Sequence, residues 1–183
     1  MGYLSNNRFC FYWHICYIYV IFIIMITYKA IKISHKNSPI IADLVYKTYA
    51  KFNKGEADKE SFKNYLSHYN SSANSEDDLA SRFKTSNINF GAFFDGKLVG
   101  VIRGKKGRII NLFVDEHFHN KGIGKNLIKL FERQAIKENS SAIKIRSSLY
   151  AVNFYLKSGY KKTTGIRLFK GIKEQPMKKI IKK

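Results

Sequence analysis

The chain has 183 residues, a length that suits one domain with a sizeable hydrophobic core. Its 33 Lys and Arg residues outnumber 13 Asp and Glu residues, for a formal net charge of +20. The basic residues are scattered over nearly every predicted element without a recognised nucleic-acid motif, so we expect no specific nucleic-acid partner. Both cysteines, Cys10 and Cys16, lie in one apolar tract without ligand partners, which excludes a disulfide framework and a metal site.

That apolar tract covers residues 9–28, which contain no Asp, Glu, Lys or Arg and are just long enough for a transmembrane helix. The flanking charges would place the following domain in the cytoplasm. Residues 26–32 also suit a first strand, and if they form it only about 24 Å of helix remains, with Met25 as a natural start. Residues 1–24 are therefore either a membrane anchor or a hydrophobic extension, and the protein is either single-pass with its C-terminal domain inside or soluble and cytoplasmic.

Helices are predicted next, over residues 40–52 and 59–69. They are separated by the acidic, flexible segment 54–58. The Ser-, Asn- and Asp-rich residues 71–78 predict a loop followed by a short helical turn.

A hairpin is predicted from residues 88–94 and 97–103, because Asp95-Gly96 between them is a strong two-residue turn signal. A second tight turn is predicted at residues 104–107. It leads into the near-continuous apolar run 108–114, which suits a strand buried on both faces.

A basic, glycine-containing turn joins that strand to an amphipathic helix over residues 122–138. The first N–H groups of a helix lack intrahelical partners and carry partial positive charge. Gly122 and Gly124 remove Cβ atoms that would hold an anion away, and Lys121 and Lys125 add charge. This turn therefore predicts a phosphate or pyrophosphate site.

A second segment with a distinct pattern follows the predicted strand 142–146. Residues 147–160 read as a short helix leading into another strand, since Ala151, Phe154 and Tyr155 share a helix face. Residues 160–170 predict that late strand, and the residues from 172 to 183 predict a basic, frayed C-terminal tail. Strands and helices in this order imply a mixed α/β sheet with helices on both faces.

Residues 112–124 resemble the acetyl-CoA-binding motif of the GNAT N-acetyltransferase superfamily, in which Arg/Gln-x-x-Gly-x-Gly/Ala follows a strand ending in an apolar-Val-Asp sequence. Residues 147–160 resemble a later motif of the same superfamily, with Phe-Tyr ahead of Gly-Phe/Tyr. His119 stands where Gln or Arg is usual, and Ser148 replaces a common Asn. The two motifs occur in the expected order and separation.

The resemblance implies an α/β fold with a mixed, mostly antiparallel central sheet of about six to seven strands and helices on both faces. It assigns an N-acetyltransferase domain to residues 25–171. The implied reaction is transfer of the acetyl group of acetyl-CoA to a primary amine, by direct attack in a ternary complex. The alternative is a non-catalytic acetyl-CoA-binding regulatory module on the same fold.

The resemblance also implies roles for individual residues, and it implies no metal. Tyr155 matches the general acid that protonates the departing CoA thiolate, although a Tyr at this position can also be an ordinary core residue. The implied cofactor-binding residues are Leu112, Phe113, Val114, His119, Asn120, Lys121, Gly122, Ile123, Gly124, Lys125 and Asn153.

The sequence identifies neither the general base, nor the acceptor amine, nor the oligomeric state. Many superfamily members use a carboxylate near the central strands, but no Asp or Glu occurs between Gly96 and Val114. Asn111 either orients a water molecule there or is a hydrogen-bonded core residue. The acidic residues of the segments expected near the acceptor either draw in a cationic amine or are solvated loop charges: Glu56, Asp58, Glu60, Glu76, Asp77 and Asp78.

Overall fold

The structure is a computed structural model that describes residues 26–182. Its strands form one eight-stranded sheet in the order β1-β2-β3-β4-β5-β8-β6, with β7 paired to β8. The strands are β1 (Thr27–Ala30), β2 (Ile88–Phe94), β3 (Lys97–Lys105), β4 (Arg108–Val114), β5 (Ala142–Ser148), β6 (Lys161–Lys162), β7 (Arg167–Phe169) and β8 (Ile172–Ile180). The helices are α1 (Ser38–Phe52), α2 (Lys59–Ser67), α3 (Glu76–Phe83), α4 (Ile123–Lys137) and α5 (Val152–Lys157), with short 3-10 helices η1 (Lys54–Glu56) and η2 (Glu116–Phe118).

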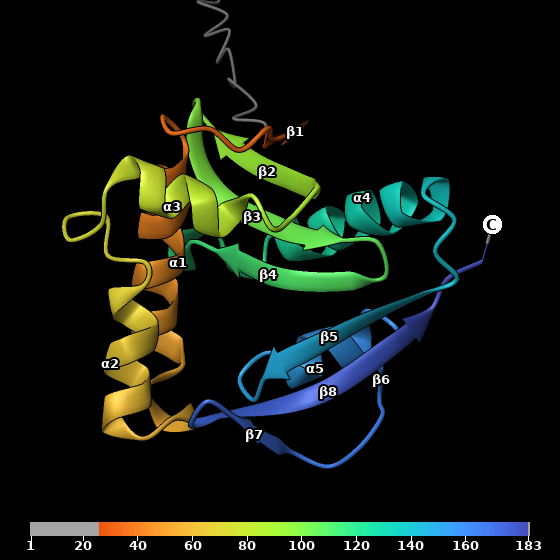
Figure 1. The fold of residues 1–183 in the computed structure, drawn as a ribbon. Coiled ribbons are helices and arrows are strands. Elements are labelled where there is room, and N and C mark those ends of the chain that lie inside the picture. Colours follow the sequence, from red (N-terminus) through yellow and green to blue (C-terminus); the bar gives the residue numbers. More distant parts are fainter. Residues whose placement is uncertain (1–25, 183) are drawn as a thin grey trace, which may run out of the picture.

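Helices cover both faces of this sheet, as the sequence predicted (Figure 1). Neighbouring residues of β3 show the arrangement, because successive side chains of a strand point to opposite faces. Val101 packs with the buried residues of α1 and α3, whereas Ile102 packs with those of α4. In the described part of the chain only β4 and β5 pair in parallel, so the predicted mixed, mostly antiparallel α/β sheet is confirmed.

The predicted hairpin and the long helix are also confirmed. Asp95 and Gly96 both adopt positive φ, 48° and 73°, as a two-residue turn between right-twisted strands requires. Helix α4 buries one stripe of apolar side chains against the sheet: Ile123, Leu127, Ile128, Phe131 and Ala135. The second turn lies later than predicted, at residues 106–107, because β3 continues through Gly104 to Lys105.

Helix α3 begins earlier and is longer than the short helical turn predicted after the loop 71–78. The Ser75 side chain accepts a hydrogen bond from the Asp78 N–H and begins the helix. Leu79, Ala80 and Phe83 are then buried against the core, which stabilises the later turns. Tertiary packing thus extends a segment whose composition resembles a loop.

The sheet opens between its two central strands. Strands β4 and β5 pair only at Arg108 and Lys144, and beyond that point they diverge. Strands β1 to β4 form one half of the sheet, and β5 pairs with β8 along its whole length in the other half (Figure 1). This opening also corrects the prediction that β4 is buried on both faces, because Ile110 keeps 37% of its surface exposed there.

The C-terminal prediction was wrong. Residues 160–170 contain only the short strands β6 and β7, and most of the predicted basic tail is strand β8, paired with β5. Met177 and Ile181 are buried, with 1% and 6% of their surfaces exposed. Lys178 and Lys179 between these residues are only partly exposed, and Lys179 pairs with Glu132. The high Lys content therefore hid a strand in what read as a basic tail.

The predicted first strand, over residues 26–32, is confirmed as β1, which pairs with β2. Thr27 and Tyr28, at the end of the apolar tract, therefore belong to the sheet. The remainder of the tract, and with it the choice between anchor and extension for residues 1–24, lies outside the described residues. Within residues 26–182, no helix has the length and apolar character needed to span a membrane.

Candidate active site

Two cavities meet where β4 and β5 diverge. One has a volume of about 510 Å³ and is bordered by the N-terminus of α4, so we call it the α4 cavity. The other, about 540 Å³, is bordered by α2 and is called the α2 cavity. Their shared lining residues mark the junction: Asn53, Leu112, Phe113, Ser148, Ala151 and Tyr155.

The N-terminus of α4 presents unpaired backbone donors to the α4 cavity. No side chain caps this helix, and in residues 26–182 the N–H groups of Ile123, Gly124 and Lys125 have no hydrogen-bond acceptor. Gly122 precedes them with φ 76°, a left-handed conformation that a glycine adopts without strain. Unpaired N–H groups and the positive end of a helix dipole suit an anion, so the geometry has the donors on which the predicted phosphate site depends.

Gly124 lines the α4 cavity and is also required for helix packing. A Cβ atom at this position would lie 3.1 Å from the Phe154 ring, so the glycine lets α4 approach α5 closely. At Gly122, a Cβ atom would meet nothing within 4 Å, so this glycine is required by its backbone conformation. Asn120 also has positive φ, 59°, and lines the same cavity.

The free edge of β4 provides further backbone donors. The Asp115 N–H donates to the Val99 carbonyl at 2.8 Å, and pairing alternates along an antiparallel ladder. The N–H groups of Leu112 and Val114 therefore point away from β3, toward the opening. The Val114 carbonyl points the same way, because it lies 2.8 Å from Nε2 of His119.

His119 lines the α4 cavity, and its ring is held by protein contacts. Its Nε2 donates to the Val114 carbonyl, which requires the proton on that nitrogen, and its ring centroid lies 5.0 Å from that of Phe52. Phe52 in turn stacks on Tyr150 at 4.8 Å. These aromatic contacts bring the end of α1 to the cavity, which no local sequence signal indicated.

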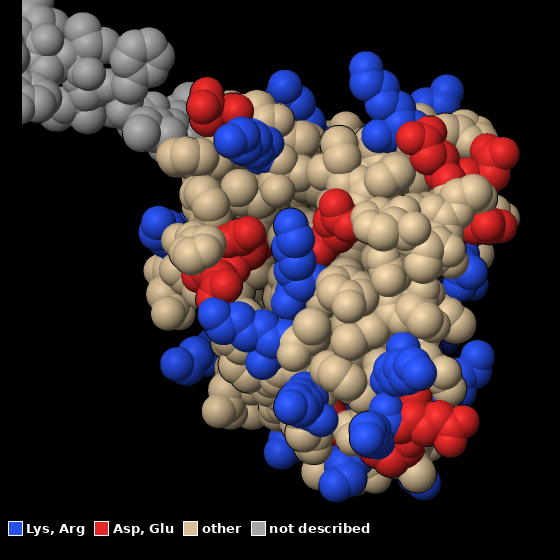
Figure 2. Space-filling view, turned by 90° about the vertical axis from the view of Figure 1, so that its left-hand side faces the viewer, with Lys and Arg blue, Asp and Glu red and all other residues tan. Residues whose placement is uncertain are grey.

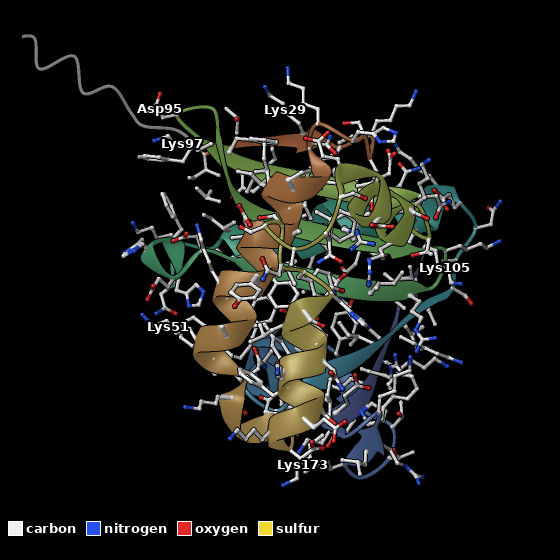
Figure 3. The ribbon with its side chains drawn as sticks, turned by 60° about the vertical axis from the view of Figure 1, so that its left-hand side comes forward. Lys29, Lys51, Asp95, Lys97, Lys105 and Lys173 are labelled. Carbon is white, nitrogen blue, oxygen red and sulfur yellow. The ribbon has the colours of Figure 1, made fainter. Side chains whose placement is uncertain are left out.

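The end of α1 is also linked to the turn after β4 by an ion pair. Lys51 points toward this turn and pairs with Glu116 of η2 (Figure 3). The hydrogen bond from Lys51 is the main cause of the lowered pKa of Glu116. Both groups are exposed to solvent, so the pair positions the turn and contributes little stability.

Lys121 and Asn153 do not line either cavity, in contrast to the other predicted site residues. Lys121 is exposed, and its ammonium lies 5.0 Å from the Phe118 ring. Asn153 is exposed on α5. The α4 cavity instead includes several residues that the sequence did not single out for binding: Thr48, Phe52, Asn53, Phe118, Ser148, Tyr150, Ala151, Phe154, Lys157 and Ser158.

Tyr155 lies at the junction and lines both cavities. Its side chain is 3% exposed, and its ring makes edge-on contacts with Phe154 and Tyr160. No hydrogen bond joins its hydroxyl to another residue of the described part of the chain. Burial raises the pKa of Tyr155 above its usual value, so the hydroxyl keeps its proton at neutral pH.

Of the acidic residues expected near the acceptor, only Glu56 lines a cavity. It is 6% exposed, which corrects its interpretation as a solvated loop charge. Its Oε1 accepts from the Tyr150 N–H at 2.7 Å and its Oε2 from the Asn53 side chain at 3.0 Å. Asp58 instead caps α2 by accepting from the Ser61 N–H, and these hydrogen bonds from Ser61 lower the pKa of Asp58.

Asn111 is a hydrogen-bonded core residue that also lines the α2 cavity. Its Oδ1 accepts from the Arg103 guanidinium at 2.9 Å. Arg103 is itself 2% exposed and stacks over the Phe83 ring at 4.1 Å. Burial lowers the pKa of Arg103 to about 10, so the guanidinium stays charged at neutral pH.

Comparisons with known proteins agree with this architecture. The solved structures that the chain resembles include a GCN5-related N-acetyltransferase from Rhodopseudomonas palustris, with a TM-score of 0.70, 18% identity and coverage of 86% of this chain and 96% of that one. The PaiA N-acetyltransferase from Thermoplasma acidophilum in complex with coenzyme A has a TM-score of 0.63 and 18% identity, with coverage of 84% of this chain and 99% of that one. The ribosomal-protein-S18-alanine N-acetyltransferase from Escherichia coli has a TM-score of 0.58 and 17% identity, with coverage of 87% of this chain and 96% of that one. At these identities the likeness shows the fold.

The sequence gives the family directly. Residues 47–181 match the family model of the acetyltransferase (GNAT) domain, and the chain therefore belongs to the GNAT acetyltransferase family. No curated protein matches the sequence.

Proposed function

We propose that the protein transfers the acetyl group of acetyl-CoA to a primary amine, by direct attack in a ternary complex. Membership of the acetyltransferase family supports acetyl transfer in general. The position of Tyr155 supports the ternary complex, because this residue lines both cavities where they meet. Acetyl-CoA in the α4 cavity and the amine in the α2 cavity would thus share one proton donor.

The α4 cavity has the groups that acetyl-CoA requires. The unpaired N–H groups at the start of α4, together with Lys125 and Lys157 in the lining, suit a pyrophosphate. The N–H groups of Leu112 and Val114 at the free edge of β4 suit the pantetheine and the thioester carbonyl. The Thermoplasma protein, which shares the fold, was solved with coenzyme A.

The reaction converts a protonated amine and acetyl-CoA into an acetamide, the CoA thiol and one proton. At pH 7 the amine, with a pKa of about 10.4, must first release a proton to solvent at a cost of roughly 4–5 kcal/mol. A backbone N–H of β4 would stabilise the negative charge that develops on the acetyl oxygen, by roughly 3–4 kcal/mol per donor. Tyr155 would give its proton to the sulfur as the C–S bond breaks, and regain one from the attacking nitrogen through solvent.

The test is release of free thiol from acetyl-CoA across a panel of primary amines. In Tyr155→Phe we expect kcat to fall at least about 100-fold with the acetyl-CoA KM unchanged, because only the proton donor is lost. Tyr160→Phe is the matched control: Tyr160 is also buried but lines neither cavity, so kcat should stay at the wild-type value.

Wild-type kcat in Tyr155→Phe would exclude the assigned proton donor. Binding of acetyl-CoA without thiol release for any amine would contradict the catalytic function as a whole.

A further inference from the structure

Glu56 is a buried carboxylate without a cationic partner. It is 6% exposed in a protein of net charge +20, yet in residues 26–182 its side chain accepts only from neutral donors, those of Asn53 and Tyr150. The other carboxylate of the α2 cavity, Glu174, is engaged differently, because its Oε2 lies 3.1 Å from Nε of Arg146. A buried charge without a counter-ion is costly, so Glu56 is the group in this cavity that a cationic ligand would stabilise.

The Tyr49 hydroxyl is a second polar group without a partner in the same cavity. The residue is 4% exposed, and its hydroxyl is buried with no hydrogen-bond partner in the described part of the chain. Its ring is fixed by stacking on Tyr65 and Phe62, with centroids 3.8 Å and 5.6 Å apart. Burial and the charges of Glu56 and Glu174 raise the pKa of Tyr49 to about 12, so the hydroxyl remains neutral.

The charge of Glu56 acts on the Tyr49 hydroxyl, and an ammonium group has enough donors for both residues. It carries three N–H donors, and both a carboxylate and a hydroxyl oxygen accept from such donors. The location is also suitable for an acceptor. Asn53, which donates to Glu56, lines both cavities and so lies at the junction where Tyr155 is found.

The rest of the α2 cavity is unsuited to a second positive charge. Arg146 and Lys170 line it, and the carboxylate of Glu174 is already paired with Arg146. His68 is neutral at neutral pH, because burial and the nearby Arg82 and Lys170 lower its pKa. On the face formed by α1 to α3, Lys and Arg side chains are interspersed with Asp and Glu, so the surface around the cavity does not itself repel a cation (Figure 2). A second ammonium group on the ligand would therefore be repelled inside the cavity, by Arg146 and Lys170.

Apolar groups instead form much of the cavity wall. Ile110 and Phe169 keep 37% and 42% of their surfaces exposed while lining the cavity. Tyr65 and Tyr69 lie on the same wall. An apolar or aromatic ligand body would bury these surfaces and gain roughly 25 cal/mol per Å² of apolar area.

We propose that Glu56 and Tyr49 bind the ammonium group of the acceptor, and that this acceptor is a primary amine with a single positive charge and an apolar or aromatic body. The inference rests on the proposed transfer to an amine and specifies which amine the same site takes. Glu56 and Tyr49 act here in recognition, before the amine loses its proton to solvent.

Matched ligands test the substrate class. Hexylamine and 1,5-diaminopentane have the same chain length and differ by a second ammonium group in place of the terminal methyl, and phenethylamine adds an aromatic ring. We expect kcat/KM for hexylamine and phenethylamine to exceed that for the diamine by at least about tenfold, because the second charge meets Arg146 and Lys170. Calorimetric binding of the same amines in the presence of CoA gives a readout that does not depend on turnover.

Two variants test the residues. Glu56→Gln removes the charge but keeps an oxygen for the Tyr150 N–H, and we expect the KM for hexylamine to rise about tenfold with the acetyl-CoA KM unchanged. Tyr49→Phe removes a hydroxyl that bonds to no described residue, so it should fold normally and raise the same KM about fivefold. Glu60→Gln is the control, because Glu60 is exposed on α2 and lines neither cavity.

The outcomes separate this inference from the proposed function. Thiol release that prefers the diamine, or that is unaffected by both variants, would overturn the inference and leave acetyl transfer intact. Amine binding that weakens in both variants, without thiol release, would support the inference and overturn the proposed function. If Glu56→Gln does not fold, Tyr49→Phe alone decides, because its hydroxyl has no structural bond to lose.

Discussion

The two cavities on either side of Tyr155 are built in different ways. The α4 cavity takes its main binding groups from one contiguous stretch, residues 112–125, and most of these groups are backbone N–H donors. The α2 cavity is assembled from side chains of α1, η1, α2, β4, β5 and β8, which are far apart in the sequence. A site made of backbone requires particular glycines at particular spacings, whereas a site made of distant side chains requires only that the fold bring them together.

The two sides also differ in how they are held. Helix α4 buries five residues in the larger core, whereas α2 has no buried residue and packs through partly exposed aromatic rings on Tyr49. Local stability follows buried apolar contact. We therefore expect the acceptor side to tolerate substitution more readily than the cofactor side, and three predictions test this contrast.

The largest expected effect on stability is in β8, the strand that contributes residues to both sides. Strand β8 carries Glu174 of the α2 cavity and Met177 of the core beneath α4 and α5. Met177→Ala should lower the free energy of unfolding by about 2–5 kcal/mol, measured by urea denaturation, because it leaves a cavity in that core. Lys173→Ala is the control, since Lys173 points to solvent near the start of the same strand (Figure 3). Equal stability of the two variants would mean that β8 is dispensable, as a tail would be.

A smaller effect is expected at the start of α4. Gly122→Ala places a Cβ in a left-handed conformation and should cost about 1–2 kcal/mol of unfolding free energy. The KM for acetyl-CoA should rise while the KM for the amine stays unchanged, the reverse of the result expected for Glu56→Gln. Gly55→Ala is the matched control, because its Cβ also meets nothing within 4 Å and its backbone is not left-handed. A shift in the amine KM would show that the two cavities are not independent.

The smallest effect is a change in alkaline stability. The pKa of Tyr49 is raised to about 12 in the folded protein, from 10.0 for the free group. Between these values the folded state binds more protons than the unfolded state, so stability falls as pH rises above about 10. From about pH 9 to about pH 11, Tyr49→Phe should lose less unfolding free energy than the wild type, by on the order of 1 kcal/mol. If the unfolding free energies of the wild type and Tyr49→Phe fell in parallel over this pH range, the Tyr49 hydroxyl would not be desolvated.

The part of the site that the sequence predicted well lies close to the main chain. Gly122 and Tyr155 are both at the α4 cavity, as expected from their motifs. Lys121 and Asn153 were expected beside them but point elsewhere, because spacing along a turn or a short helix does not determine which way an exposed side chain faces. Glu56 was named among six acidic residues, and it is distinguished from the others by its burial and by its contact with Tyr150, 94 residues away.

The sequence by itself determined the local geometry of this protein: the Asp95-Gly96 hairpin, the amphipathic α4 and the glycine-containing turn that precedes it. Each of these depends on backbone conformation, which neighbouring residues control directly. Only the tertiary structure decided that residues 172–180 complete the sheet and that a buried carboxylate lines the α2 cavity. Which side chains are buried, and which groups they hydrogen-bond to, depends on the positions of distant elements. A short stretch of sequence does not specify those positions.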